Sequence, residues 1–302
     1  METTQYEQSQ AVAAQLPTAA DNPQTATRYD RQELSRIVEY LTSRKIFNPE
    51  YILLFGSLTG GTQHSEASCY DLLAAVQNIP ADGDWLEAKS GLRRILPYKH
   101  RTITYINIYL CRLNDIQTGV MPYQYFAHKE GELVYCKERY RFNRPKRVCN
   151  FAAIYRDAAT YFDTFMPLGE LLIKAASAGS PRSSTEIRWS AYMSAQAAKI
   201  FYKVLYFVFH NEEFYCDDLV IMHDRMRTLS TDLMLLFDSN TLERKNTLAS
   251  LRKFESKALH DQSFSVNPNN LSNYMADVAS MKTIVEKCCR LRLELYKSSI
   301  ES

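Results

Sequence analysis

The sequence lacks the features that would place it in a membrane or a secretory route. None of its apolar runs approaches the roughly 20 residues that a bilayer-spanning helix needs. The nearest candidate, residues 200–209, is about half as long as such a helix and contains Lys203. The first ten residues, METTQYEQSQ, have no basic start followed by an apolar centre, as a secretory signal would. We therefore expect a cytoplasmic protein with no membrane partner.

The net charge is close to zero, and the cysteines follow no recognised motif. With 36 Lys and Arg against 34 Asp and Glu, the net charge is +2, so a claim of nucleic-acid binding must depend on local charge. The seven cysteines are odd in number and contain no C-x-x-C pair. This pattern argues against a disulfide framework or a cysteine metal cluster.

Changes in pattern along the chain predict two domains. Residues 1–27 are rich in Gln, Ala and Thr without a hydrophobic period, which is typical of a disordered tail. We expect an α+β domain at residues 28–136, with a small mixed sheet and helices. A basic linker at 137–149 and an all-α helix bundle at 150–302 should follow.

The first domain should alternate helices and strands. Leu34, Ile37, Val38 and Leu41 recur at helical spacing in a helix expected to end near Asn48-Pro49. The other predicted elements are strands at 51–55, 70–76 and 102–110, a helix at 84–96, and a short helix followed by an edge strand across 124–134.

The second domain is helical in period throughout. We expect about five helices, near 151–177, 184–210, 217–238, 241–260 and along the C-terminus, with Pro167 starting or kinking a helix. The two predicted buried stripes are Trp189, Met193, Ala197, Ile200, Val204 and Val208, and Tyr274, Val278, Met281, Val285, Cys288, Leu291 and Leu295. Cys288 and Cys289 should be core residues.

The linker KERYRFNRPKRVCN is locally basic. It has basic residues at 137, 139, 141, 144, 146 and 147 against the single acid Glu138, with Tyr140 and Phe142 among them. Basic residues interleaved with aromatics can bind RNA through phosphate charge and base stacking, here along residues 137–147. Alternatively, the segment is a solvated linker whose aromatic rings pack locally.

The stretch LFGSLTGGTQHSEASCYDLL, which begins at Leu54, is the clearest candidate for a phosphate-binding site. Glycine at position 56 lets the backbone approach a phosphate closely, and the Ser57 hydroxyl and neighbouring N–H groups can donate to its oxygens. A second predicted strand follows with Cys69 and Asp71.

These residues resemble the nucleotidyltransferase superfamily of the polymerase-beta type, especially its minimal members. The family motif is a hydrophobic strand, Gly-Ser, a short loop, and a strand with Asp-x-Asp. Phe55-Gly56-Ser57 matches the first part and Cys69-Tyr70-Asp71 the second. The resemblance implies that Gly56, Ser57 and Asp71 bind a nucleoside triphosphate with Mg²⁺.

The match to this family is degenerate. Cys69 stands where the first aspartate should be, and a thiol is a poor ligand for Mg²⁺. Asn107 is the best candidate for the position of the third carboxylate, so Asp71 is the one remaining metal-binding acid. Cys69 could instead be a nucleophile, but no histidine pairs with it in the sequence, and a small buried strand residue is the expected role.

The helical half is similar to the HEPN family. Gln196-Ala197-Ala198 resembles the core of its second helix, with Lys199 where the family has an acid, and His223-Asp224 resembles a later His-Asp-Leu segment. The resemblance implies a homodimer through the helical domain and a groove near Gln196, Lys199, His223 and Asp224. His223 could instead be a hydrogen-bonded structural residue.

Three functions follow from these resemblances. The first is a non-catalytic regulatory module that binds a nucleotide or RNA. The second is an active nucleotidyltransferase that modifies a protein, a tRNA or a small acceptor. The third is a HEPN-type ribonuclease of a toxin–antitoxin or defence system, although the family's Arg-to-His spacing is missing from the helical half.

Overall fold

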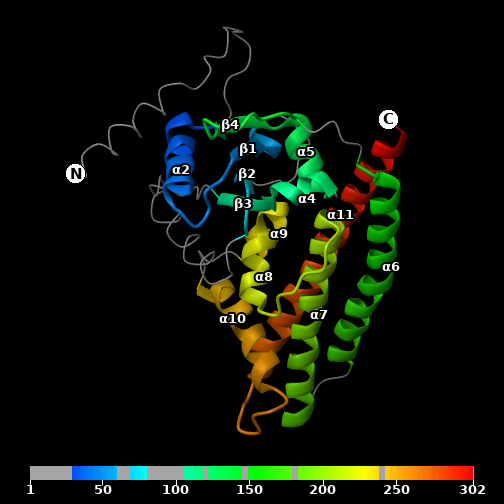
Figure 1. Ribbon diagram of the computed structural model, residues 1–302. Helices are drawn as coiled ribbons and strands as arrows, with labels where there is room; N and C mark the ends of the chain where they lie inside the picture. The colour runs from blue at the N-terminus through cyan, green and yellow to red at the C-terminus, as the bar shows by residue number, and fades with distance from the viewer. Residues whose placement is uncertain are drawn as a thin grey trace, which may run out of the picture. The chain divides into compact units, whose positions relative to one another are not determined.

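The computed structural model describes residues 29–59, 69–79, 105–118, 121–144, 149–178, 183–237 and 242–301 (Figure 1). The chain forms two compact units. Unit 1 comprises Met1–His64, Ser68–Val120 and Gln124–Arg147, and unit 2 comprises Ser65–Ala67, Met121–Tyr123 and Val148–Ser302. In the described ranges, no helix is both long and apolar enough to cross a membrane.

Unit 1 is built on a four-stranded mixed sheet with the order β3-β2-β1-β4. Strand β1 is antiparallel to β2 and β4, whereas β2 and β3 run parallel. The elements are α2 Arg31–Ser43, β1 Tyr51–Phe55, the 3-10 turn η1 Gly56–Leu58, β2 Cys69–Val76, β3 Tyr105–Arg112, α4 Leu113–Thr118, α5 Pro122–Glu130 and β4 Glu132–Cys136.

Several predicted elements of unit 1 are confirmed. The strands at 51–55 and 70–76 are β1 and β2, and the short helix followed by an edge strand is α5 and β4. The third strand is described from Tyr105 and continues to Arg112, past the predicted end at residue 110. The helix predicted at 84–96 lies outside the described residues.

Helix α2 covers part of the sheet core but ends earlier than predicted. Asp30 caps it by accepting hydrogen bonds from two backbone N–H groups of the first turn. The helix stops at Ser43 rather than near Asn48, because Arg44 is extended and its carbonyl accepts from the N–H groups of Phe47 and Asn48 in a turn. The residues packed in this core include Leu34, Ile37, Leu41, Ile52, Leu54, Tyr70, Leu72 and Ala74.

Unit 2 is helical. Its elements are α6 Phe151–Ala176, α7 Ser184–His210, α8 Leu219–Met226, the 3-10 turn η2 Arg227–Leu229, α9 Thr231–Leu236, α10 Leu242–Lys257 and α11 Pro268–Glu301. The single helix predicted at 217–238 is therefore wrong, because the chain turns at η2 and Ser230 caps a new helix. Pro167 does not start a helix, since it lies inside the continuous α6.

Both predicted stripes of unit 2 need correction. Trp189 is 47 % exposed although Ser190 and Ala191 directly after it are buried, because the covered face of α7, which α6, α8, α10 and α11 contact, is rotated away from Trp189. On α11, Leu291 is 58 % exposed and the neighbouring Arg292 is buried in its place. Cys288 and Cys289 are buried, as predicted.

Candidate functional site

The turn after β1 requires a glycine. Gly56 has a φ of +80°, in the left-handed region that side chains disfavour. A Cβ atom at this position would also lie 2.7 Å from the Asp71 Oδ2 atom. Thr59 closes the turn, because its hydroxyl donates to the Gly56 carbonyl at 3.0 Å. Ser57 lies in the same 3-10 turn.

Cys69, Asp71 and Asn107 meet at one end of the sheet. Cys69 and Asp71 are two residues apart on β2, so their side chains share a face. Asn107 is the register partner of Asp71 on the parallel strand β3. Its Nδ2 atom donates to Asp71 Oδ1 at 2.8 Å and reaches Cys69 Sγ at 3.6 Å. The structure thus brings these three residues together beside Gly56.

The donor set of this cluster does not fit Mg²⁺. The cation requires several oxygen ligands, whereas the cluster offers a carboxylate, a thiol and an amide that turns its nitrogen toward the acid. Within the described ranges, no three His, Cys, Asp or Glu side chains are grouped to hold a metal ion. Cys69 and Asp71 are both fully buried. The geometry is that of a buried cluster in which a hydrogen bond reaches the Asp71 Oδ1 atom.

The aromatic residues of the basic linker pack within unit 1. The ring of Tyr140 stacks on Tyr51 with centroids 5.6 Å apart, and Phe142 meets Tyr51 edge-on at 4.8 Å. The Tyr51 hydroxyl also hydrogen-bonds to His128 Nε2 at 2.7 Å. These contacts match the local-packing interpretation of the two linker rings.

One basic residue of the linker caps a helix. The Arg144 guanidinium donates to the carbonyls of His128, Lys129 and Gly131 at 3.1, 2.9 and 2.7 Å. These carbonyls lie at and just beyond the C-terminal end of α5, where a cation is favourable. Arg144 therefore holds the linker against unit 1.

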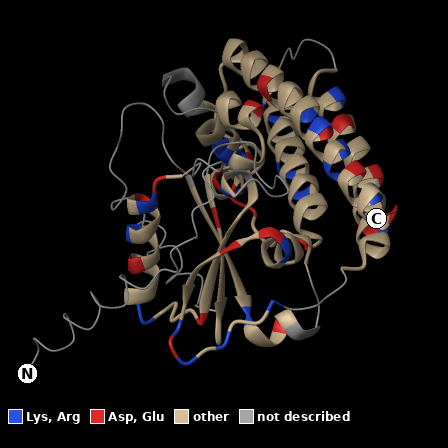
Figure 2. Ribbon diagram, turned by 90° about the horizontal axis from the view of Figure 1, so that it is seen from above, with Lys and Arg blue, Asp and Glu red and all other residues tan. Residues whose placement is uncertain are grey.

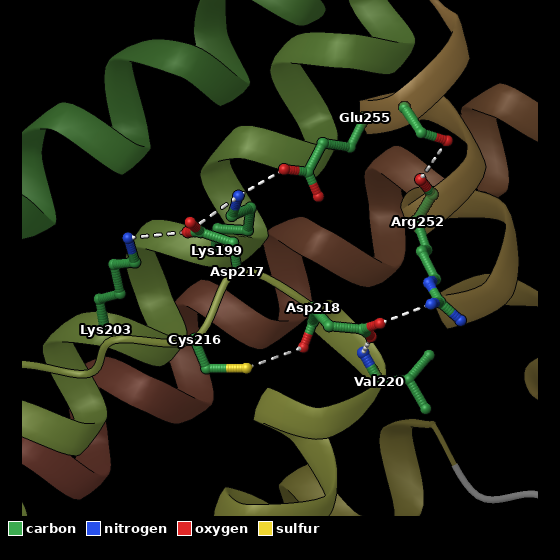
Figure 3. Close-up of polar contacts among 9 residues, drawn as sticks. Lys199, Lys203, Cys216, Asp217, Asp218, Val220, Arg252 and Glu255 are labelled. Carbon is green, nitrogen blue, oxygen red and sulfur yellow. Dashed lines mark hydrogen bonds and ion pairs between the residues drawn. The ribbon is translucent and has the colours of Figure 1, made fainter. Parts of the chain in front are cut away.

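In unit 2, Lys199 lies at the centre of an ion-pair network (Figure 3). Its side chain projects from α7 and pairs with Glu255 of α10 and, at 3.2 Å, with Asp217. Lys203, one turn further along α7, also pairs with Asp217, at 3.1 Å. Burial acts to lower the pKa of Lys199, but hydrogen bonds and charge from Glu255 and Asp217 outweigh it and raise that pKa.

A second ion pair ties the same segments together. Asp218 caps α8 by accepting from the Val220 N–H at 2.9 Å, and it pairs with Arg252 of α10 at 2.7 Å (Figure 3). The sequence analysis missed these partners of the candidate groove. The capping position of Asp218 before a helix was a usable signal, whereas Glu255 lies 56 positions from Lys199 and no spacing rule connects them.

The other groove candidates lie in different groups. His223 is buried, and its Nδ1 atom is 2.8 Å from the hydroxyl of the fully buried Tyr202. Burial, aided by the charge of Arg227, lowers the pKa of His223 to about 3. Asp224 pairs with Arg227 at 2.9 Å, and Gln196 is half-buried on α7. These contacts describe a structural histidine.

Comparison with known proteins finds a weak similarity to a solved structure. No protein-family model matches the chain, and no curated protein matches it. The chain is similar to the crystal structure of the spectinomycin adenyltransferase AAD(9) from Enterococcus faecialis with ATP and spectinomycin. The similarity has a TM-score of 0.32 and 13% identity, and it covers 85% of this chain and 100% of that one. At that TM-score it carries no argument about fold or function.

Proposed function

We propose that this chain is a nucleotidyltransferase-like protein that has lost metal-dependent transfer, joined to a HEPN-like helical domain, and that it acts as a nucleotide-binding regulatory module. The observation that carries the proposal is the hydrogen bond from Asn107 to Asp71. In a transferase of this type, carboxylates at these positions would share divalent cations. Here the Asn107 amide donates to the Oδ1 atom of the acid, where a transferase would place a metal-binding carboxylate.

The charge balance of the cluster supports a loss of catalysis. Two-metal phosphoryl chemistry needs several anionic ligands to hold the cations and the triphosphate in line. Asp71 is the one acid of β2, and Cys69 and Asn107 are neutral or soft at the other two positions. One carboxylate that already accepts a hydrogen bond is a poor substitute for three.

The helical half supports the same conclusion. A lysine can hold a phosphate as a point charge, but Lys199 is already paired with Glu255 and Asp217. Binding a phosphate there would require breaking both pairs and placing the anion beside two carboxylates. The buried, neutral His223 is bonded to Tyr202, so it is not placed for proton transfer to a ligand.

Nucleotide binding would depend on the β1 turn. Gly56 has no side chain at the point where the chain leaves the sheet, so a ligand can approach the backbone there. Ser57 and Leu58 follow in a tight turn. Backbone N–H groups in such turns can bind phosphate oxygens without a metal ion. We therefore expect nucleotides to bind equally well with and without a divalent cation.

The transfer test uses the full chain with each of the four labelled ribonucleoside triphosphates and Mg²⁺ or Mn²⁺. We expect no label on the protein itself, on tRNA or on a hydroxylated acceptor. Asp71→Asn is the matched control, because it keeps the side-chain shape. Metal-dependent labelling by the wild type that Asp71→Asn abolishes would overturn the loss of catalysis.

The binding test measures the melting temperature with each nucleotide. A ligand at 100 times its Kd stabilises the folded state by about 2.7 kcal/mol, which raises the melting temperature by several degrees. The rise should not depend on the metal. The double variant Cys69→Asp/Asn107→Asp restores the missing acids, so its nucleotide binding should become metal-dependent. No rise with any nucleotide would contradict the binding part of the proposal.

A further inference from the structure

Two loops that are distant in sequence meet at the end of the sheet where β1 begins. Residues 44–50 precede β1, and residues 137–144 follow β4. The Lys137 N–H donates to the Glu50 carbonyl at 2.9 Å, and its Nζ atom reaches Asn48 Oδ1 at 3.1 Å. Figure 2 shows Lys and Arg segments spaced along the loops at the lower edge of the sheet. The two loops together form one surface, which we call the basic rim.

The basic rim is more positively charged than the chain as a whole. Its sequences RKIFNPE and KERYRFNR contain six basic residues and two acids, although the chain has a net charge of only +2. Lys137 is paired with Glu50 at 3.3 Å, and Arg144 caps α5. The remaining cations are Arg44, Lys45, Arg139 and Arg141.

These four cations are available to a ligand. All four side chains are exposed, and none forms an ion pair with another residue in the described ranges. The Arg44 guanidinium lies 4.9 Å from the centre of the Tyr40 ring, a contact that orients the group and keeps its charge. Glu138 is the one exposed acid among them.

The packing of the linker holds two of these cations outward. Tyr140 and Phe142 are half-buried against Tyr51, and the alternate residues Arg139 and Arg141 are exposed. The Cys136 thiol also lies 3.2 Å from the Tyr140 carbonyl. These contacts hold the linker backbone, so the entropy cost of binding falls mainly on the exposed arginine side chains.

We propose that the basic rim binds the phosphodiester backbone of a nucleic acid. The ligand is recognised by charge rather than by stacking, because the rings of Tyr140 and Phe142 are occupied by Tyr51. Four exposed cations at the edges of two ordered loops match a chain of regularly spaced phosphates better than a single compact anion.

The basic rim is separate from the candidate nucleotide site. Phe55, beside Gly56, is the register partner of Asp71, whereas Tyr51 at the rim end of the same strand pairs with Ala75. Four residue steps along a strand span about 13 Å. This proposal is therefore independent of nucleotide binding, and either can fail without the other.

The experiment measures binding of fluorescein-labelled 20-nucleotide single-stranded RNA to the full chain by fluorescence polarisation from 50 to 250 mM KCl. Four neutralised phosphates predict a slope of log K against log salt of about −2.8 for a single strand. Arg139→Gln/Arg141→Gln and Arg44→Gln/Lys45→Gln should each halve the slope. All four side chains are exposed, so the melting temperature should stay unchanged.

Matched controls distinguish the effect of the rim cations from that of positive charge elsewhere on the protein. Lys253→Gln/Lys297→Gln removes two exposed cations of unit 2 and should leave the slope unchanged. DNA of the same sequence is a second probe. Equal binding of DNA and RNA assigns the shared phosphodiester as the ligand, and tighter RNA binding adds a contribution from the ribose.

Three outcomes would overturn the proposal. The first is a flat salt response of the wild type. The second is a loss of slope in the unit 2 control equal to that in the rim variants. The third is binding to phosphatidylserine vesicles, lost in the rim variants, with no binding to either nucleic acid, which would assign the surface to a membrane instead.

Discussion

Asp71 in unit 1 and Lys199 in unit 2 are both buried charged residues held by their neighbours, but the partners differ. Asp71 accepts a hydrogen bond from the neutral amide of Asn107, its register partner on the adjacent strand. Lys199 pairs with two carboxylates that come from separate segments. The first arrangement depends on strand geometry and the second on charge, so the two should respond differently to substitution, pH and salt.

Gly56→Ala tests the strand geometry around Asp71. A left-handed φ costs a non-glycine residue about 1–2 kcal/mol, and the new Cβ would press on the Asp71 carboxylate. We expect unfolding in urea to show a total loss of about 3 kcal/mol. Adding Asp71→Ala should recover the part that comes from the contact. Equal stability of Gly56→Ala and the wild type would contradict this account of the turn.

Lys199→Met tests the ion pairs that hold Lys199. The substitution keeps the apolar length of the side chain but removes the Lys199 cation from Glu255, while Asp217 keeps its pair with Lys203. We expect a loss of about 2 kcal/mol, less than for a fully enclosed pair because Asp217 is largely exposed. The double variant Lys199→Met/Glu255→Leu should be more stable than the single variant in urea unfolding. If the two losses simply add, the pair is not coupled.

The free energy of unfolding measured against pH tests the burial of His223 in unit 2. Burial lowers the pKa of His223 to about 3, while the unfolded chain has a histidine pKa of about 6.5. The unfolded state therefore takes up a proton first, so stability is full above about pH 6.5 and falls progressively toward pH 3. His223→Gln should reduce the loss between pH 7 and 5 by about 2 kcal/mol. The exposed His260→Gln is the control and should not change it.

The smallest effect is expected at the solvent side of the network. The Asp217 side chain is 74% exposed, although it pairs with both Lys199 and Lys203. Asp217→Asn should cost no more than about 0.5 kcal/mol at low salt, and added salt should reduce that cost. A large, salt-independent loss would show that this carboxylate acts as a buried group.

The candidate site in unit 1 could be predicted from the sequence because strands follow simple rules. A side-chain period of two places Cys69 and Asp71 on one face, and pairing with the next strand brings Asn107 beside them. The helical stripes were less predictable. Trp189 and Leu291 fit the apolar period but are exposed, because the neighbouring helices decide which part of each helix is covered.

The amino-acid sequence sets which chemical groups this protein carries and where they lie along the chain. It places one acid on β2, a thiol and an amide at the neighbouring positions, and a run of cations after β4. The tertiary structure decided which of these groups remain accessible. The pairing of Lys199 with Glu255 and the joining of residues 44–50 to residues 137–144 connect distant parts of the chain. Such contacts arise only when packing brings the segments together, since local spacing carries no information about them.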